Sequence, residues 1–167
     1  MVSAILARRS IRKYIDRPVS EEIVNELLTA GMAAPSARNR QPWHFIIINK
    51  RDLLDKIPEY HPYSKMILEA PLAIMVCGNA DLDDNEGYLA LNCAAATQNI
   101  MVRATELGLG TVWLGIYPRE PRVAGLRNLL NIPPHIKPIS LIVVGYPGES
   151  KPPHDALDQG KVTWNNW

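Results

Sequence analysis

The stretch EGYLALNCAAATQNIMVRATEL, residues 86–107, predicts a long helix around which the rest of the chain must pack. Beyond its first residue its only charged side chains are Arg103 and Glu106, so the helix is apolar on nearly every side, and Gly108 and Gly110 close it. A chain of 167 residues can hardly cover such a helix alone. We therefore expect an obligate homodimer with this helix at or near the interface; the alternative is a central core helix of a monomer.

Short apolar runs on both sides of the long helix predict strands. They occupy residues 44–49, 72–77, 111–114 and 139–144. Helical patterns lie between them at residues 52–57 and 122–130, with a turn near 64–69. Helices that alternate with strands indicate a layered α/β arrangement rather than a bundle or a sandwich of two sheets.

The first forty residues predict two helices and a loop. Ile5 and Leu6 would share one face of a short helix, and Arg8 and Arg12 would converge if that helix ran through them. Ser20 is a good N-cap for a second helix with apolar residues at helical spacing, which Pro35 ends. Residues 35–43 are thus expected to form a loop.

Composition excludes several classes of function. The net charge of +1 favours neither nucleic acid nor an anionic membrane as partner, and the apolar segments contain too many amides to span a bilayer. The chain reaches arginine at once, without the apolar core of a secretory signal, and Cys77 and Cys93 are expected to be buried thiols rather than a disulfide. We therefore expect one cytoplasmic domain, residues 1–167.

Known catalytic signatures are missing. Gly108 and Gly110 begin like a dinucleotide fingerprint, but Trp113 holds the third glycine position and the glycines follow a helix rather than a strand. The four histidines lack metal-ligand spacing, so we expect no metal and interpret them as surface or capping residues. His61-Pro62-Tyr63 could instead belong to a mobile loop over a pocket, because aromatic and imidazole groups suit a planar acceptor.

The stretch RRSIRKY, residues 8–14, offers three arginines and a serine within five residues. Arginine binds phosphate oxygens bidentately and keeps its proton, so this stretch predicts a phosphate clamp. Basic residues near a helix C-terminus are also commonly just solvated. The small and amide side chains of residues 34–43 suit a polar, planar ligand, and together the two stretches suggest a phosphorylated heterocycle.

These stretches and three others resemble the recurring blocks of the nitroreductase family in their usual order. The blocks are RRSIRKY (8–14), APSARNRQPW (34–43), QN (98–99), ELGLGTVWLG (106–115) and VGYP (144–147). The resemblance implies an α+β sandwich with a mixed, mostly antiparallel sheet flanked by helices, in an intertwined homodimer. Two FMN molecules would lie at the subunit interface, and neither site would be complete in a monomer.

The resemblance also implies roles for particular residues. Arg8, Arg9 and Ser10 would bind the phosphate and ribityl end of FMN, Arg12 the pyrimidine edge, and the backbone of Leu114 and Gly115 would approach N5. The partner chain would contribute Pro35, Ser36, Ala37 and Asn39, and Gln98 is a further cofactor-binding candidate. Members often carry closely spaced basic residues in the C-terminal tail, where this chain offers only Lys151 and His154. The stretch 151–153 is otherwise expected to leave the core.

By the same resemblance, the chain would pass hydride from NADH or NADPH through flavin N5 to a nitroaromatic or a quinone, with ping-pong kinetics. No catalytic side chain is expected, because the flavin carries the chemistry. The alternatives are a flavin storage or sensing protein, a dedicated flavin enzyme such as a reductive dehalogenase, and a dimeric interaction module without cofactor. The sequence does not reveal the acceptor, the preferred nicotinamide or whether a lid covers the flavin.

Overall fold

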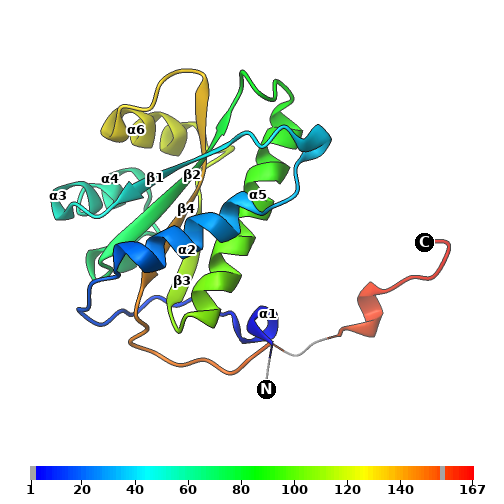
Figure 1. Cartoon of the computed structure of the whole chain (residues 1–167), viewed down its shortest axis with the longest axis horizontal. Coiled ribbons are helices and arrows are strands. Elements are labelled where there is room, and N and C mark those ends of the chain that lie inside the picture. Colours follow the sequence, from blue (N-terminus) through cyan, green and yellow to red (C-terminus); the bar gives the residue numbers. More distant parts are fainter. Residues whose placement is uncertain (1–2, 155–156) are drawn as a thin grey trace.

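The computed structural model describes residues 3–154 and 157–167, and its centre is a four-stranded sheet with helices on both faces (Figure 1). The strand order is β1-β2-β4-β3, and each neighbouring pair is antiparallel. The strands are β1 (Trp43–Ile48), β2 (Leu72–Asn79), β3 (Gly110–Gly115) and β4 (Ile136–Gly145). The four predicted strands are confirmed, and the antiparallel pairing makes the fold α+β.

The helices predicted around residues 20–34, 86–107 and 122–130 are confirmed with small shifts at their ends, whereas the helix predicted at residues 52–57 is divided into two short helices by a turn at residues 55–56. The helices are α1 (Ala4–Ala7), α2 (Glu21–Met32), α3 (Arg51–Leu54), α4 (Ile57–Tyr60), α5 (Glu86–Glu106) and α6 (Glu120–Leu130), with short 3-10 turns η1 (Ala37–Asn39), η2 (Lys65–Leu68) and η3 (Gln159–Lys161). The predicted N-cap of α2 is confirmed, because the Ser20 hydroxyl accepts a hydrogen bond from the Ile23 backbone N–H.

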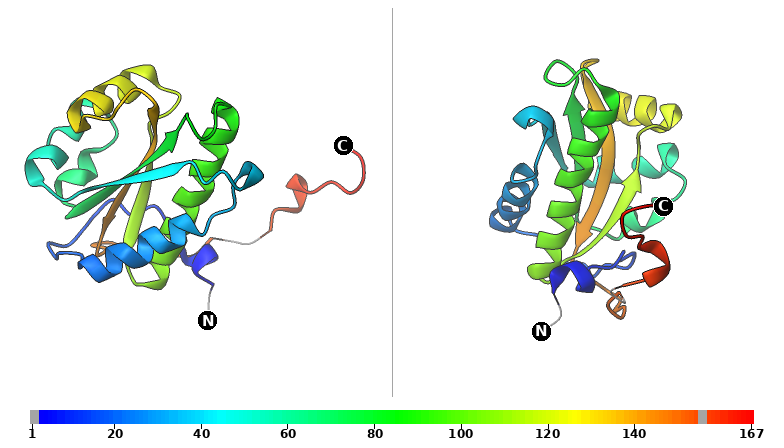
Figure 2. Two further views of the ribbon diagram at one scale, coloured as in Figure 1. Left: turned by 45° about the horizontal axis from the view of Figure 1, so that its top comes forward. Right: turned by 90° about the vertical axis from the view of Figure 1, so that its right-hand side faces the viewer.

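The side chains of β2 alternate between the two faces of the sheet, and the core is accordingly divided into two layers. Leu72, Ile74 and Val76 pack with buried side chains of α2 and α5, whereas Ala73, Met75 and Cys77 pack with those of α3, α4 and α6. Successive side chains of a strand point to opposite faces, so a strand that is apolar throughout must be covered on both. The right-hand view of Figure 2 shows α2 and α5 on one side of the sheet and α6 on the other.

Helix α5 is covered on one side only within a single chain. The side chains of Cys93, Ala96 and Ile100 are fully buried, whereas 53% of Tyr88 and 66% of Leu91 are exposed on the outer side. The helix is therefore not a fully enclosed core helix of one chain. Among helices built from the described residues, none has the length and hydropathy needed to cross a bilayer.

The first helix is shorter than the convergence of Arg8 and Arg12 on one helical face requires, so that prediction is wrong. Helix α1 ends at Ala7, and the chain continues as extended backbone. Ser10 forms a parallel bridge with Thr111 at the start of β3, and Tyr14 forms an antiparallel bridge with Pro147. Backbone hydrogen bonds to these distant residues replace the helical ones.

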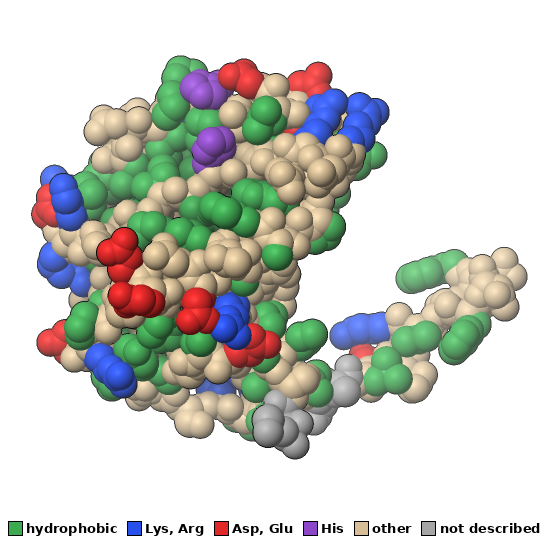
Figure 3. Space-filling view, in the orientation of Figure 1, with side chains coloured by type: hydrophobic (Ala, Val, Ile, Leu, Met, Phe, Trp, Pro, Cys, Tyr) green, Lys and Arg blue, Asp and Glu red, His purple; other side chains and the backbone are tan. Residues whose placement is uncertain are grey.

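The proline-containing stretch after β4 stays on the body of the protein, contrary to the prediction that it leaves the core. The Arg9 guanidinium donates to the Pro152 carbonyl, and the His154 N–H donates to the Leu6 carbonyl at 2.9 Å. Only the last residues extend away from the body (Figure 3). They carry exposed apolar side chains, among them Leu157, Trp164 and Trp167.

Candidate functional site

The arginine segment, Arg8–Tyr14, is held by backbone hydrogen bonds on both sides. The Ile11 N–H donates to the Thr111 carbonyl at 2.9 Å, and the Gly148 N–H donates to the Lys13 carbonyl at 2.8 Å. The side chains of Arg8, Arg9 and Ser10 are half-buried and that of Arg12 is exposed. The pairing fixes the segment while leaving guanidinium groups accessible to a ligand.

The C-terminal tail reaches the arginine segment through Lys151. The Lys151 ammonium donates to the Ser10 carbonyl at 2.6 Å and lies 3.2 Å from the Glu149 carboxylate. The same carboxylate accepts a hydrogen bond from the Arg12 backbone N–H at 2.6 Å, which is the largest cause that lowers the pKa of Glu149. Lys151 thus contacts the arginine segment, whereas the hydrogen bond of His154 is made by its backbone N–H to Leu6, outside that segment.

A groove of about 570 Å³ opens beside the end of β3. We call it the Trp113 groove; it is lined by Arg12, His61, Pro62, Tyr63, Lys65, Met66, Trp113, Leu114, Gly115 and Arg122. Three of the predicted site residues, Arg12, Leu114 and Gly115, therefore meet in one cavity. The size lies within the range of small-molecule sites, and the lining combines aromatic and cationic groups in the way such sites do.

The Gly115 carbonyl is fixed by two side chains. Arg122 Nη1 donates to it at 2.7 Å, and His61 Nε2 lies 3.2 Å from it. Because a carbonyl only accepts, the His61 proton is on Nε2, and Nδ1 is buried without a hydrogen-bond partner among the described residues. No atom outside the adjoining residues lies within 4 Å of the position that a Cβ would take at Gly115, so this residue leaves the groove open.

His61 is buried, with 3% of its surface exposed, and it is the C-cap residue of α4, so of the two interpretations the capping residue is confirmed and the surface residue is wrong. Its alternative place beside a pocket is confirmed, because it lines the Trp113 groove together with Pro62 and Tyr63. Burial lowers the pKa of His61, and the positive charge of Arg122 lowers it further. The lowered pKa favours the neutral imidazole, whose Nε2–H donates to the Gly115 carbonyl.

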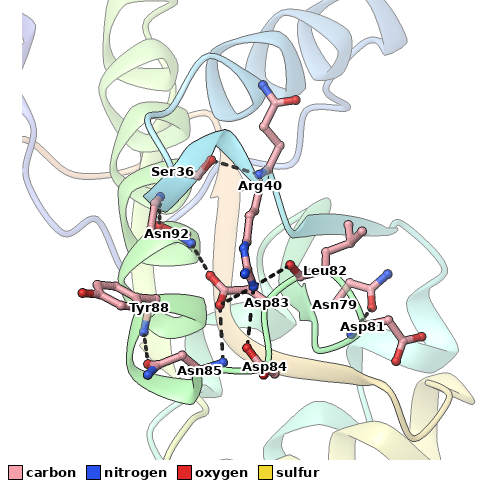
Figure 4. Close-up of polar contacts among 12 residues, drawn as sticks. Ser36, Arg40, Asn79, Asp81, Leu82, Asp83, Asp84, Asn85, Tyr88 and Asn92 are labelled. Carbon is pink, nitrogen blue, oxygen red and sulfur yellow. Dashed lines mark hydrogen bonds and ion pairs between the residues drawn. The ribbon is translucent and has the colours of Figure 1, made fainter.

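The second predicted block, the 36–41 loop, lies elsewhere and is held by a buried carboxylate (Figure 4). Asp83, with 3% exposed, accepts from Asn92 Nδ2 at 3.2 Å and from the Asn85 N–H at 3.3 Å, and it pairs with Arg40 at 3.4 Å. Asn92 in turn accepts from the Ala37 N–H at 3.0 Å. The network ties the loop to the first turns of α5.

The backbone of the 36–41 loop is strained. Arg38, Asn39 and Gln41 have φ angles of 53°, 55° and 47°, in the left-handed region. Each such residue costs about 1–2 kcal/mol when it is not glycine, so the surrounding contacts must hold the loop in place. A hydrogen bond from the Gln41 N–H to the Ser36 hydroxyl, at 2.9 Å, contributes to this.

The predicted site residues fall at three places in one chain. Asn92 anchors the 36–41 loop near the N-terminus of α5, whereas the arginine segment pairs with β3 beyond the C-terminus of α5 (Figure 1). Helical rise separates Asn92 from the helix end by about 22 Å. The Trp113 groove includes no residue of the loop, and Gln98 lines a third hollow with Ile5 on the outer side of α5.

The sequence does not predict the contacts that hold the 36–41 loop and the Gly115 carbonyl in place. Asp83 precedes the N-cap Asn85 in a short polar turn, which by itself predicts only the start of a helix. Arg122 and His61 lie 61 positions apart in the sequence, and no local pattern connects either of them with Gly115. A polar residue such as Asn92 inside an apolar helix was the available signal.

Comparison with known proteins gives consistent matches over the chain. A family model described as "Nitroreductase family" matches residues 5–62 and 59–146. A Methanothermobacter thermautotrophicus protein named "Putative NADH dehydrogenase/NAD(P)H nitroreductase" is 46% identical over all of this chain and 87% of its own length. The Bacillus subtilis "FMN reductase [NAD(P)H]" is 27% identical over 97% of this chain and 72% of its own.

Solved structures show the same likeness in three dimensions. An "FMN-dependent Nitroreductase" from Clostridium difficile R20291 superposes with a TM-score of 0.92 at 28% identity, with all of both chains covered. A protein from Parabacteroides distasonis, whose name is the same as that of the archaeal relative, superposes with a TM-score of 0.94 at 42% identity, over 98% of this chain and 96% of its own.

Proposed function

Because the chain belongs to the nitroreductase family, we propose that it is an FMN-dependent oxidoreductase that passes hydride from NADH or NADPH to a small acceptor such as a nitroaromatic or a quinone. The observation that carries this proposal is the Trp113 groove, where Arg12, Leu114 and Gly115 converge on one cavity. The relatives named for FMN and NAD(P)H support both the cofactor and the electron donor.

The groove fits a flat heterocycle. Gly115 lines the cavity and a Cβ there would meet no other atom within 4 Å, so glycine keeps this part of the lining free of side-chain atoms. Two donors hold the Gly115 carbonyl, which makes this backbone rigid before a ligand arrives. Arg12 supplies a permanent positive charge at the groove, where it would stabilise negative charge on a reduced heterocycle.

The arginine segment would hold the phosphate of FMN. Arg8, Arg9 and Ser10 are adjacent in the extended backbone, and Lys151 adds a fourth polar group through its contact with Ser10. Guanidinium groups bind phosphate oxygens through charge-assisted hydrogen bonds, which are stronger than neutral ones. We propose that Lys151 completes this site in place of the closely spaced basic residues that the tail lacks.

A complete site would need two chains. The residues that line the Trp113 groove of one chain do not include Pro35, Ser36, Ala37 or Asn39 of the same chain. We propose a homodimer packed through the exposed side of α5, in which the 36–41 loop of each chain meets the groove of the other. The exposed Leu91 and Tyr88 support an interface there, and Gln98 would be buried in it.

When bound, FMN would supply the hydride chemistry, because it would accept two electrons from the nicotinamide and pass them to the acceptor. The chain's own part is to bind and orient the flavin and its substrates and to exclude water. Trp113 and Tyr63 offer aromatic surface for stacked partners, and neutral His61 keeps the Gly115 backbone fixed without adding charge. Donor and acceptor would use the same groove in turn, which gives ping-pong kinetics.

The test is an absorbance spectrum of the purified protein, followed by anaerobic addition of NADH and then NADPH. We expect a flavin spectrum that bleaches with at least one nicotinamide and returns on addition of a quinone or a nitroaromatic. Flavin that resists both nicotinamides would indicate storage or sensing, and poor reoxidation by generic acceptors would indicate a dedicated enzyme. A protein that stays colourless after incubation with FMN would contradict the proposal.

A further inference from the structure

The Trp113 groove is lined by three cations, Arg12, Lys65 and Arg122, and the described residues that line it include no aspartate or glutamate. The three differ in their contacts with acidic groups. The Arg12 backbone N–H donates to the Glu149 carboxylate at 2.6 Å, whereas among the described residues no carboxylate hydrogen-bonds or ion-pairs with Lys65 or Arg122. The positive charges of Lys65 and Arg122 are therefore unpaired.

Both cations retain donors for a ligand. Arg122 uses Nη1 to hold the Gly115 carbonyl at 2.7 Å, which fixes its position and leaves further N–H groups of its five. Within residues 3–154 and 157–167, no side-chain hydrogen bond or ion pair engages the Lys65 ammonium. A fixed guanidinium and an unpaired ammonium that line the same groove are favourable groups for binding an oxyanion.

Aromatic surface adjoins these cations. Tyr63 is 73% exposed and Trp113 is 36% exposed, and the Arg122 guanidinium lies 5.9 Å from the centre of the Tyr63 ring. An exposed aromatic side chain in a cavity offers a stacking surface to a planar group. The groove thus combines exposed aromatic surface with two positive charges.

We propose that Lys65 and Arg122 form an oxyanion subsite for the second substrate of the groove, which selects a planar molecule bearing a carboxylate or phosphate. This inference rests on the proposed function and names its substrate class. The oxyanion belongs either to the acceptor, as an aromatic carboxylate, or to the nicotinamide donor, as one of its phosphates. The two sources share the same chemistry and differ in which substrate loses affinity when the subsite is removed.

The experiment compares benzoate with benzamide, two unreactive probes of the same shape and different charge. Their binding to the FMN-supplied protein is measured by saturation-transfer NMR for the wild type, Lys65→Ala, Lys65→Glu and the control Lys56→Ala, an exposed lysine outside the groove. We expect Lys65→Ala to weaken benzoate about 5-fold and to leave benzamide unchanged. Lys65→Glu should reverse the preference, and Lys56→Ala should match the wild type.

Steady-state KM values for NADH and NADPH in the same variants identify the source of the oxyanion. Weaker benzoate binding with unchanged donor KM assigns the subsite to the acceptor, and a raised donor KM assigns it to the nicotinamide. Equal effects of Lys65→Ala on benzoate and benzamide, or no effect on benzoate and either donor, would overturn the proposal. The NMR signal does not need flavin, so a protein without FMN fails the proposed function and not this test.

Discussion

The arginine segment and the 36–41 loop are both candidate ligand-binding regions, but they are built in different ways. The arginine segment has exposed or half-buried charged side chains on a backbone paired with Thr111 and Gly148. The 36–41 loop has a strained backbone that depends on a buried carboxylate, Asp83. One region offers charge, and the other offers a backbone held in a costly conformation. Substitutions in the first region should therefore affect ligand binding alone, whereas those in the second should destabilise the fold and, with it, the part of the site that the loop contributes.

The largest effect is expected for Asp83→Ala. This change removes the acceptor for Asn92 and Arg40 and leaves the buried Asn92 amide without a partner. We expect the free energy of unfolding to fall by about 2–4 kcal/mol, as for other buried polar groups that lose their partner. Urea denaturation measures this fall in the free energy of unfolding. The control is Asp84→Ala, because the Asp84 side chain is 94% exposed and should matter little; equal losses would show that the buried network does not hold the loop.

A smaller change in free energy, and one confined to binding, is expected for Arg12→Ala and for Arg8→Ala. A charge-assisted contact contributes about 1.5–3 kcal/mol, so the Kd for FMN should rise about 10- to 150-fold in each variant. Fluorescence titration of flavin measures the Kd, and the urea midpoint should stay that of the wild type. Lys13→Ala, an exposed neighbour, serves as the control. Unchanged flavin content in both arginine variants would refute the assignment of the site.

Mixing the two kinds of variant tests whether the regions meet between chains. If each site takes its arginine segment from one chain and its loop from the other, a mixed dimer of Arg12→Ala and Asp83→Ala has one intact site and one doubly defective site. Random pairing after subunit exchange would then restore wild-type affinity to about one quarter of the sites. The fraction of restored sites is measured as the amount of flavin bound at a limiting FMN concentration. If no sites are restored, the arginine segment and the 36–41 loop of each site belong to the same chain.

The features that the sequence could predict are those with a local signal, and the features that it could not predict depend on contacts with distant residues. The strands and α2 follow from local patterns, because apolar runs and the Ser20 cap carry their own signal. The charged side chains of the arginine segment were likewise visible in the sequence. Its extended backbone was not, because the hydrogen bonds that hold Ile11 and Ile15 come from Thr111 and Tyr146, a hundred or more positions away.

The network around the 36–41 loop could not be predicted for the same reason. Asp83 resembles any polar residue before a helix, and only the packing of the loop against α5 buries it. The resemblance to a family supplied the expected ligand contacts of residues 35–39 but not the network that holds these residues in place. Their roles toward FMN, those of the other predicted site residues, the single domain of residues 1–167 and the cytoplasmic location stay predictions.

The smallest effect is expected from pH, and it should arise at the groove rather than at the loop. The folded protein lowers the pKa of His61 below its ordinary value of 6.5, through burial first and Arg122 second, so protonation favours the unfolded chain. The contribution of neutral His61 to stability is complete above pH 6.5 and is lost as the pH falls toward the lowered pKa. Urea denaturation of the wild type and His61→Gln at pH 8 and pH 5 measures the difference. Glutamine can still donate to Gly115 but does not titrate in this range, so the variant should lose less stability on acidification; an equal loss would place the pH dependence in other residues.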